Sequence, residues 1–549
     1  MKTFSISKLK KSLGLILRNH RFGIFTGLMV GTSYIPFPPW AIFFCYMPLM
    51  FVFLNPENNL KRVFWNGWWS QFTLSMIGFH WIYHVATEFG HLPPALSLLI
   101  LFLFSSLVHL YIPLTCVAVH FAQNKFSLSR FQTFLTFALT LSLAERIWPG
   151  IFDWHLGYTL LWIKSPVTQW ADVIGFEGIS TLLLLTQASL LEFFLRYKER
   201  QPLLRTSPLL LAPLLIWGLL HFTGLNKRTE WSASDRTLSV APIQANIGNL
   251  EKIQSEQGSG YEYKVIQRHF ELMKIAQQKN PLLDLYIWPE TAFPDLLDEQ
   301  FLQFNRQQFL LQQLKLYPSP ILLGGYSRQK FPPRKPGLEP QVKNYNALFL
   351  FDQNQNLISF YRKTELLIFG EYIPLSETFP ILLDWFPFIA GFGRGPGPTT
   401  LALNPRANPN EVVLLGAQIC YEGLNPKFTR KLSEKGAQVL INLTNDSWFG
   451  KYFEPHQHLM MTLARAIEVR RPLVRSTNTG ITVVIQADGT IEQQSPLHLP
   501  WTDIFDVRYQ TAAKQTVYVK YGHLDWVLLS LLLIGILGSS LIRTRSKEK

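Results

Sequence analysis

The stretch EVVLLGAQICYEG spans residues 411–423 and joins an apolar run to an abrupt polar end. Its aliphatic side chains up to Ile419 are typical of a β-strand, and Glu422 and Gly423 interrupt that pattern. Cys420 is therefore the last residue of the expected strand. A strand that ends in a tight turn presents its last side chain at the rim of a sheet, where active sites are commonly built. The pattern predicts an α/β domain with Cys420 at such a rim.

The three cysteines of the chain divide into two groups. Cys45 and Cys116 lie in long apolar segments, where a small buried side chain is the expected role. Cys420 is the only cysteine of its domain, so it has no partner there for an intramolecular disulfide. Its position leaves two interpretations open, a nucleophilic thiol and a buried inert one.

The composition of the 549-residue chain excludes several classes of protein. Hydrophobic residues make up 48% and charged residues 16%, whereas a disordered chain is poor in apolar residues and rich in charge. Three cysteines are too few for a small disulfide-stapled secreted domain. The mean hydropathy of +0.11 averages apolar sequence from about residue 13 to 222 with ordinary globular sequence from about 232 to 521.

Eight apolar stretches approach the ~20 residues that a helix needs to cross a bilayer. They cover about 16–34, 38–54, 64–86, 94–122, 131–148, 170–195, 207–224 and 526–542. We therefore predict an α-helical transmembrane bundle and one globular domain. The bundle comprises a membrane domain at 1–231 and a last helix with a basic tail at 522–549, and the catalytic domain at 232–521 lies between them in sequence. The first stretch could also be a cleaved signal peptide, but no small-residue cleavage pattern follows it.

Lysine and arginine positions predict the orientation of this bundle, because short loops that carry them stay cytoplasmic. Basic residues gather before residue 22, in every second connection between the spans, and in the C-terminal tail, whereas Arg146 and Lys164 depart from the pattern. We expect both termini in the cytoplasm and the domain at 232–521 on the outer, periplasmic face. The net charge of +14 then comes mainly from basic residues that flank the membrane spans on the cytoplasmic side. We therefore expect no nucleic-acid partner.

A nucleophilic Cys420 needs a base or a nearby cation, and its acyl intermediate needs oxyanion donors. Two other strand ends offer such groups. The segment 283–288 is typical of a buried strand and is followed by Glu290, and 357–361 predicts a strand followed by Lys363. Taken singly, a glutamate or lysine is more often a solvated surface residue. The case for a site rests on their combination.

Glu290, Lys363 and Cys420 also occur in the order of a known triad. They lie in WPET, YRKTELLIFGEYIP and ICYEG, which resemble the Glu–Lys–Cys motifs of the carbon-nitrogen hydrolase (nitrilase) superfamily. NLTNDSWFG at 442–450 and RPLVRSTNTGIT at 471–482 match further motifs. The resemblance implies an α-β-β-α sandwich. With seven expected spans before this domain and one after it, the whole chain resembles the apolipoprotein N-acyltransferase family.

That resemblance implies an activity and roles for the triad. Cys420 would take an acyl chain from the sn-1 position of a phospholipid, with phosphatidylethanolamine as the expected donor, and form a thioester. The chain would then pass to the α-amine of the N-terminal diacylglyceryl-cysteine of an apolipoprotein, the last step of lipoprotein maturation in the bacterial inner membrane. Glu290 would move the protons, and Lys363 would stabilise the oxyanion with the backbone N–H of Tyr421. The family implies ping-pong kinetics, no metal or other cofactor, and a monomer.

Further residues match positions that the family uses around the triad. Glu371 and Glu422 would support it, and Tyr421 would shape the acyl or amine site; structural ion pairs and rim packing are the alternatives. Because both substrates are lipids, apolar loops should form the mouth of the site. Candidate lid residues, each with core packing as its alternative, are Phe369, Trp385, Phe392, Trp448 and Phe449. Ile253 stands where the family often has tryptophan, which leaves any contact of that tryptophan in doubt.

Two other functions are compatible with parts of the sequence. A membrane-tethered amidase or nitrilase would use water as its acceptor, but one anchor would suffice for it. A transporter or scaffold would use the spans themselves, yet the spans carry few ionisable residues beyond His80 and Glu145. His456 and His458 beside Glu454 suggest a metal site, but the following sequence is typical of a helix, on which residues two apart diverge.

Overall fold

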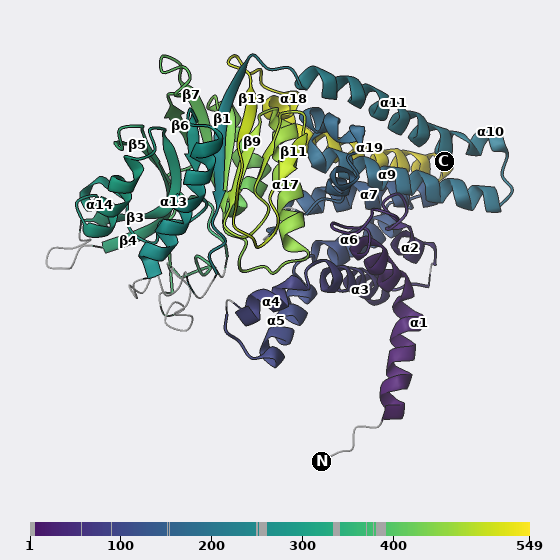
Figure 1. The fold of residues 1–549 in the computed structure, drawn as a ribbon. Helices are drawn as coiled ribbons and strands as arrows, with labels where there is room; N and C mark the ends of the chain where they lie inside the picture. The colour runs from purple at the N-terminus through teal and green to yellow at the C-terminus, as the bar shows by residue number, and fades with distance from the viewer. Residues whose placement is uncertain are drawn as a thin grey trace. The chain divides into compact units, whose positions relative to one another are not determined.

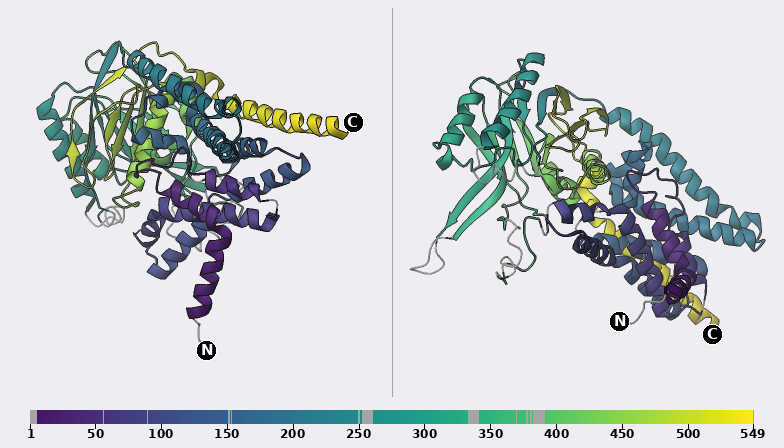
Figure 2. Two further views of the ribbon diagram at one scale, coloured as in Figure 1. Left: turned by 90° about the vertical axis from the view of Figure 1, so that its right-hand side faces the viewer. Right: turned by 60° about the horizontal axis from the view of Figure 1, so that its bottom comes forward.

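The computed structural model describes residues 6–548 apart from 56, 89, 151, 153, 249–250, 252–260, 333–340, 369, 377, 380 and 382–390. Ile253 and the candidate lid residues Phe369 and Trp385 therefore lie outside the described residues. The chain divides into two compact units, Met1–Lys227 with Lys520–Lys549 and Arg228–Val519. Each unit is described by itself (Figures 1 and 2).

The first unit is helical, as its long apolar stretches predict. Among the described residues, four helical stretches are long and apolar enough to cross a membrane: Pro94–Lys125, Pro166–Lys198, Pro208–Trp231 and Val517–Arg543. Helix α19 packs on α7 although the two are distant in sequence. The longer helices of the unit are α1 (Ile6–Gly31), α3 (Leu60–Gly78), α4 (Trp81–Glu88), α5 (Pro94–Leu107), α6 (Tyr111–Lys125), α7 (Arg130–Ile147), α9 (Ala171–Lys198), α11 (Pro208–Trp231) and α19 (Asp525–Glu548).

Three expected spans are not single helices, and one of them, 94–122, is divided between α5 and α6. The segment 38–54 consists of turns followed by the short helices α2 (Met47–Met50) and η1 (Phe51–Leu54), so the prediction of a continuous span there is wrong. Prolines at 36, 38, 39 and 48 explain the difference, because proline has no N–H for the helical hydrogen bond. The segment 64–86 is divided between α3 and α4 at Phe79 and His80.

The second unit contains two β-sheets, as the expected α-β-β-α sandwich requires. The first has the order β12-β1-β2-β3-β4-β5 with β13 also paired to β1, and the second has the order β11-β10-β9-β8-β7-β6. The first sheet comprises β1 (Arg236–Gln244), β2 (Leu285–Ile287), β3 (Ile321–Phe331), β4 (Gln341–Phe351), β5 (Leu357–Arg362), β12 (Trp501–Thr502) and β13 (Phe505–Tyr509). The second comprises β6 (Thr400–Leu403), β7 (Val413–Ile419), β8 (Val439–Thr444), β9 (Leu473–Thr477), β10 (Val483–Ile485) and β11 (Ile491–Gln494).

Strand directions bring the expected site residues to one edge of this unit. In the first sheet β1, β2 and β3 are parallel, and β5 regains their direction through two antiparallel pairings. In the second sheet β7, β8 and β9 are parallel. The sheets face each other, since β1 contacts β9 and the Ser476 hydroxyl donates to the Ile287 carbonyl at 3.1 Å. The carboxyl ends of β2, β5 and β7 carry Glu290, Lys363 and Cys420.

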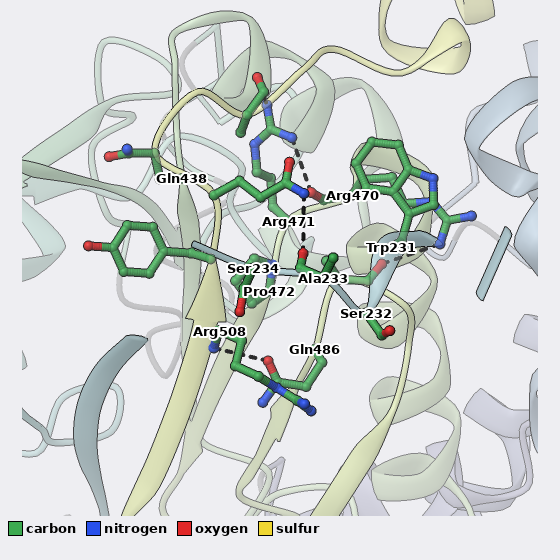
Figure 3. A pocket seen from close by; sticks show the side chains of 14 residues that line it. Trp231, Ser232, Ala233, Ser234, Gln438, Arg470, Arg471, Pro472, Gln486 and Arg508 are labelled. Carbon is green, nitrogen blue, oxygen red and sulfur yellow. Dashed lines mark hydrogen bonds between the residues drawn. The ribbon is translucent and has the colours of Figure 1, made fainter. Parts of the chain in front are cut away.

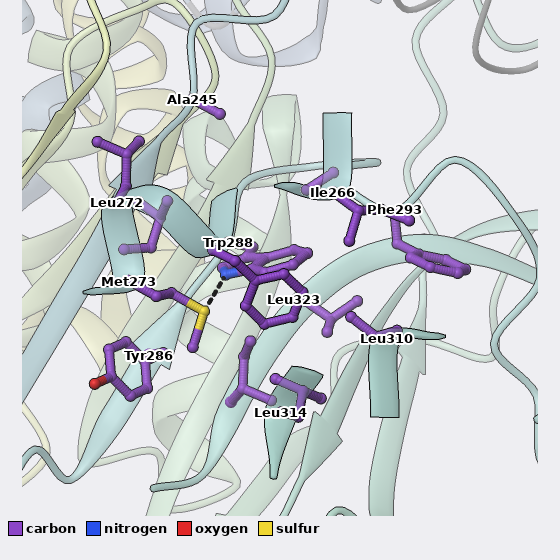
Figure 4. Packing of buried hydrophobic residues seen from close by; sticks show 14 of the residues in the cluster. Ala245, Ile266, Leu272, Met273, Tyr286, Trp288, Phe293, Leu310, Leu314 and Leu323 are labelled. Atoms are coloured by element: carbon purple, nitrogen blue, oxygen red, sulfur yellow. Dashed lines mark hydrogen bonds between the residues drawn. The ribbon is translucent and has the colours of Figure 1, made fainter. Parts of the chain in front are cut away.

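Helices cover the outer faces of the sheets (Figure 1). Helix α13 (Tyr261–Lys279) and α14 (Asn305–Leu314) lie on the first sheet, and α16 (Pro426–Glu434) and α17 (Glu454–Val469) on the second. The core beneath α13 centres on Trp288, whose indole N–H lies 3.1 Å from the Met273 sulfur and whose ring stacks on His269 (Figure 4). Large buried side chains contribute roughly 1.5–3 kcal/mol each, so this core fixes the strand end that precedes Glu290.

Candidate active site

Cys420 lies where β7 passes into the short helix η5 (Cys420–Leu424). Its backbone has φ +53°, a left-handed conformation that costs a non-glycine residue about 1–3 kcal/mol. Asn442 Nδ2 donates to the Cys420 carbonyl at 3.0 Å, and glycine at 423 leaves room for this amide, because a Cβ there would lie 2.7 Å from the same nitrogen. Such strained residues cluster at functional sites, and this one aims a single thiol at the rim.

Lys363 lies between two carboxylates at the end of β5. Its Nζ is 3.3 Å from Glu290 Oε1 and 2.8 Å from Glu371 Oε2, and only 1% of the lysine side chain is exposed. Cys420 interacts electrostatically with all three groups. The backbone of β3 closes on Glu290 at Gly324, where a Cβ would lie 2.5 Å from the Pro289 carbonyl oxygen. The three residues that the sequence motifs single out therefore lie together with Glu371 in one buried cluster.

Asn346, on β4, was not predicted from the sequence and fixes both carboxylates of this cluster. Its Nδ2 donates to Glu290 Oε1 at 2.7 Å and to Glu371 Oε1 at 3.1 Å. The N–H of Leu367 donates to the other oxygen of Glu371 at 2.9 Å. The Asn346 amide thus holds one oxygen of each carboxylate, and the Leu367 N–H holds the second oxygen of Glu371. The signal for Asn346 is its position at the edge of the apolar run of β4, since a polar residue on a continuously buried strand needs a partner.

Glu422 joins the turn at Cys420 to the loop that carries Lys363. Its Oε1 accepts hydrogen bonds from the Tyr361 hydroxyl at 2.6 Å and the Thr364 N–H at 2.7 Å, and its Oε2 accepts one from the Ile419 N–H at 2.8 Å. Burial raises the pKa of Glu422 to about 7 against the lowering effect of these donors. Glu422 therefore acts on the backbone around the cluster, whereas Glu371 contacts Lys363 directly.

Tyr421 ties the turn to a buried charged network behind it. Its ring stacks on His458 at 5.0 Å and meets Phe449 edge-on, and its hydroxyl donates to Glu454 Oε1 at 3.1 Å. His458 Nδ1 in turn lies 3.1 Å from Asp446 Oδ1. Arg475 donates to Asp446 Oδ2 at 2.7 Å, and both members of this ion pair are fully buried. The network follows the end of β8 and places the residue next to the thiol.

Asp446, Glu454 and His458 offer ligating atoms within 4.8 Å of one another. Arg475 neutralises Asp446 at this point, however, and the imidazole already lies within bonding distance of both carboxylates. Burial raises the pKa of Asp446, but the charges of Arg475 and His458 outweigh it and lower the pKa overall. The group fits an internal ion-pair network better than a cation site. His458 takes part, whereas the suspected His456–His458 pairing does not enter the cluster.

The described lid candidates differ in their surroundings. Phe449 is 5% exposed and packs against Tyr421, so it is a core residue. Trp448 is half-buried. Phe392 is half-buried, its N–H donates to the Glu371 carbonyl at 3.1 Å, and its ring stacks on Tyr326. Of the three, Phe392 lies next to the buried cluster through the backbone.

A small pocket at the opposite strand ends carries no comparable chemistry (Figure 3). It lies among Trp231, Gln438, Arg470 and Arg471, where β8 and β9 begin. The Arg471 guanidinium donates to the carbonyls of Ala437 at 2.7 Å and Ala513 at 3.0 Å. Burial lowers the pKa of Arg471 to about 10. Backbone carbonyls accept the hydrogen bonds of this guanidinium, so Arg471 has a structural role.

The electrostatics of the cluster predict a protonated thiol in the resting protein. Burial and the charge of Glu290 raise the pKa of Cys420 above its ordinary 9.0, and Lys363 offsets this only in part. Burial lowers the pKa of Lys363, but Glu371 and Glu290 outweigh it and raise the pKa well above 10.5, so the ammonium persists. The thiol then needs a base at the moment of attack.

We expect the rate of Cys420 alkylation by iodoacetamide to keep rising with pH through 9, because only the thiolate reacts. Peptide mass spectrometry of the full chain in detergent would follow the label residue by residue, with the buried Cys45 and Cys116 as internal controls. A plateau below pH 7 would show a preformed thiolate and contradict this electrostatic description.

Comparison with known proteins agrees with the fold. Residues 240–519 match the carbon-nitrogen hydrolase family, and residues 26–189 match the N-terminal domain of apolipoprotein N-acyltransferase. The apolipoprotein N-acyltransferase of Bdellovibrio bacteriovorus is 47% identical over 532 residues, which cover 96% of this chain and 95% of that relative. The chain belongs to the apolipoprotein N-acyltransferase family. Its fold class and its assignment as an acyltransferase of lipoprotein maturation, both expected from the sequence, are confirmed.

More distant members of the apolipoprotein N-acyltransferase family extend the match. The relative in Geobacter metallireducens is 28% identical over 81% of this chain and 80% of its own length. The relative in Pseudomonas putida is 30% identical over 84% of this chain and 85% of its own length. Together with the four long apolar helices, the family assignment makes this chain a membrane-bound acyltransferase.

Proposed function

We propose that this acyltransferase works through a thioester on Cys420, with Glu290 as proton carrier and Lys363 as oxyanion stabiliser. The observation that carries the proposal is the buried cluster in which Lys363 Nζ lies 3.3 Å from Glu290 and 2.8 Å from Glu371, next to a thiol held at a strained strand end. It supplies a nucleophile, a base and a fixed positive charge, which acyl transfer requires.

In the first half-reaction the Cys420 sulfur attacks the sn-1 ester carbonyl of a phospholipid, and the thiol proton passes to Glu290. The oxyanion forms beside the Lys363 ammonium and the backbone N–H of Tyr421. The C–O bond then breaks, and the departing glycerol oxygen takes the proton from Glu290. The lysophospholipid leaves, and the acyl chain remains on sulfur as a thioester. Because the pKa of Lys363 is raised, its positive charge is constant through these steps.

In the second half-reaction the α-amine of a diacylglyceryl-cysteine attacks the thioester carbonyl. Glu290 takes a proton from the attacking nitrogen, the C–S bond breaks, and the thiolate of Cys420 recovers a proton from Glu290. The product is an amide, and the enzyme returns to its resting state. Since each substrate meets the same nucleophile in turn, ping-pong kinetics follow.

Glu371, Glu422 and Tyr421 act as positioning residues in this proposal. Glu371 orients Lys363, Glu422 fixes the loop of Lys363 against the turn of Cys420, and Tyr421 connects that turn to the buried network. Phosphatidylethanolamine is the proposed donor and an apolipoprotein the acceptor. The enzyme acts as a monomer in the bacterial inner membrane, with the domain at 232–521 in the periplasm and both termini in the cytoplasm. The basic connections between the apolar stretches support this orientation.

Product analysis separates this function from a hydrolase that uses water. With phosphatidylethanolamine and a diacylglyceryl-cysteinyl peptide, we expect mass spectrometry to find an N-acylated peptide and lysophospholipid in equal amounts. A Cys420→Ala variant should form neither. Free fatty acid as the main product in the presence of the peptide would contradict the transfer function and favour the membrane-tethered amidase.

A further inference from the structure

A second hollow opens at the same strand ends as the buried cluster. It has a volume of about 510 Å³, within the ~300–1,000 Å³ typical of ligand sites. Its wall comes from the loops that follow β1, β8 and β9, through Asn246, Ser447 and Thr479, with His498 and Arg268 of α13 beyond them. These are the carboxyl ends of parallel strands, the edge at which Glu290 and Cys420 also lie.

The hollow adjoins a small pocket that contains Glu290. That pocket is lined by Ile247, Glu290 and Asn478, among others. Ile247 directly follows Asn246, and Asn478 directly precedes Thr479, so the same two loops border both spaces. A molecule in the hollow therefore lies beside the loops that cover the proposed proton carrier.

The shared wall is held in place by its own hydrogen bonds. The N–H of Ile247 donates to Asn478 Oδ1 at 2.8 Å, and Asn478 Nδ2 donates back to the Ile247 carbonyl at 2.8 Å. Asn246 Nδ2 donates to the His498 carbonyl at 3.0 Å, and the His498 N–H donates to the Thr479 carbonyl at 2.9 Å. A wall fixed in this way is preorganised for a ligand.

The chemistry of the wall is polar. The Thr479 hydroxyl is buried and has no hydrogen-bond partner among the described residues, although a buried polar group normally has one. Arg268 and Glu251 form a part-exposed ion pair at 3.0 Å and offer both signs of charge. An acyl chain in the hollow would remove water from the part-exposed Arg268–Glu251 pair without bonding to it. A peptide backbone, with a donor and an acceptor in each residue, can hydrogen-bond to such polar groups.

We propose that this hollow binds the peptide segment that follows the lipidated N-terminal cysteine of the acceptor. The inference rests on the proposed function, because the α-amine of that cysteine must reach Glu290 in the second half-reaction. The two loops bordering Glu290 would then carry the adjoining residues of the acceptor. The phospholipid donor has no peptide, so only the acceptor substrate would occupy the hollow.

The test measures the two half-reactions of the full chain in detergent separately. Thr479→Val removes the unpartnered hydroxyl at constant shape, and Arg268→Gln removes one charge of the wall. Arg508→Gln is a matched control, since Arg508 also forms an exposed ion pair, with Glu492, but lies on β13 beside the beginning of β1. The acceptors are a diacylglyceryl-cysteine amide and the same lipid with four polar residues attached. Thermal unfolding checks that each variant folds.

In the wild type we expect a lower KM for the peptide-bearing acceptor than for the amide. Each of the two variants should raise the KM for the peptide-bearing acceptor about three- to tenfold, the effect of one hydrogen bond or exposed charge. The KM for the amide and the rate of acyl-enzyme formation should stay unchanged, as should every value for Arg508→Gln.

Two results would overturn the assignment. Slower acyl-enzyme formation with an unchanged peptide KM would place the phospholipid head group in the hollow, and unchanged values in both variants would show that it binds neither. If the wild type itself formed no acyl-enzyme, the proposed function would fail. That outcome is distinct from either result on the hollow.

Discussion

Replacing Lys363 by methionine is expected to slow acyl-enzyme formation by about 10²–10³-fold and to destabilise the protein by about 3–5 kcal/mol. The kinetic loss follows from removing the charge beside the developing oxyanion. The loss of stability follows from the burial of Glu290 and Glu371, which would face each other without their common cation. Stopped-flow acylation with a fluorescent phospholipid and thermal unfolding of the full chain in detergent measure the two effects.

A second substitution separates the catalytic from the structural contribution of Lys363. Adding Glu371→Gln to Lys363→Met removes one of the two stranded carboxylates, so we expect most of the stability to return. The acylation rate should stay low, because no cation replaces Lys363. Recovery of both properties in the double variant would mean that Lys363 acts only as a structural counter-ion, contrary to the proposed mechanism.

Replacing Asp446 by asparagine is expected to destabilise the protein by about 3–5 kcal/mol, because it leaves the fully buried Arg475 without its counter-charge. It would also loosen His458, on which the Tyr421 ring stacks. We therefore expect slower acyl transfer in addition to a lower unfolding temperature.

Glu492→Gln provides the matched control for this prediction. Glu492 pairs with Arg508 at 2.6 Å, but both side chains are exposed, and surface ion pairs contribute about 0–1 kcal/mol. Combining Asp446→Asn with Arg475→Met should recover part of the lost stability, since the second change removes the stranded charge. If Asp446→Asn and Glu492→Gln had equal, small effects, the network behind Tyr421 would not support the site.

Short patterns predicted the strand ends of the catalytic unit well. The strands preceding Glu290, Lys363 and Cys420 are β2, β5 and β7, close to the bounds expected from their apolar runs. A polar residue directly after an apolar run can be recognised from the neighbouring sequence alone, because the apolar pattern of the strand stops at that residue. The pairing of the strands has no such signal. β5 and β7 belong to different sheets, and no local pattern in the chain shows that their ends meet at one edge.

Residues that act through long-range contacts were harder to predict. NLTNDSWFG and RPLVRSTNTGIT match family motifs, but the sequence does not show that Asp446 and Arg475 pair between them. Asn346 stands in an ordinary strand, and its two carboxylate partners lie 56 and 25 residues away. In the membrane unit, the apolar stretches predicted helices. The segment 38–54 is not a continuous helix because of the prolines before residue 50.

The central claim is that Cys420 carries the acyl chain, and acyl-enzyme trapping tests it most directly. The full chain in detergent is incubated with phosphatidylethanolamine labelled in its sn-1 chain, quenched in acid, and digested for mass spectrometry. We predict a label on the peptide that contains Cys420, removed by neutral hydroxylamine because a thioester is cleaved under those conditions, and absent from Cys420→Ala. An active protein with no such label, or a label that persists in Cys420→Ala, would contradict the account.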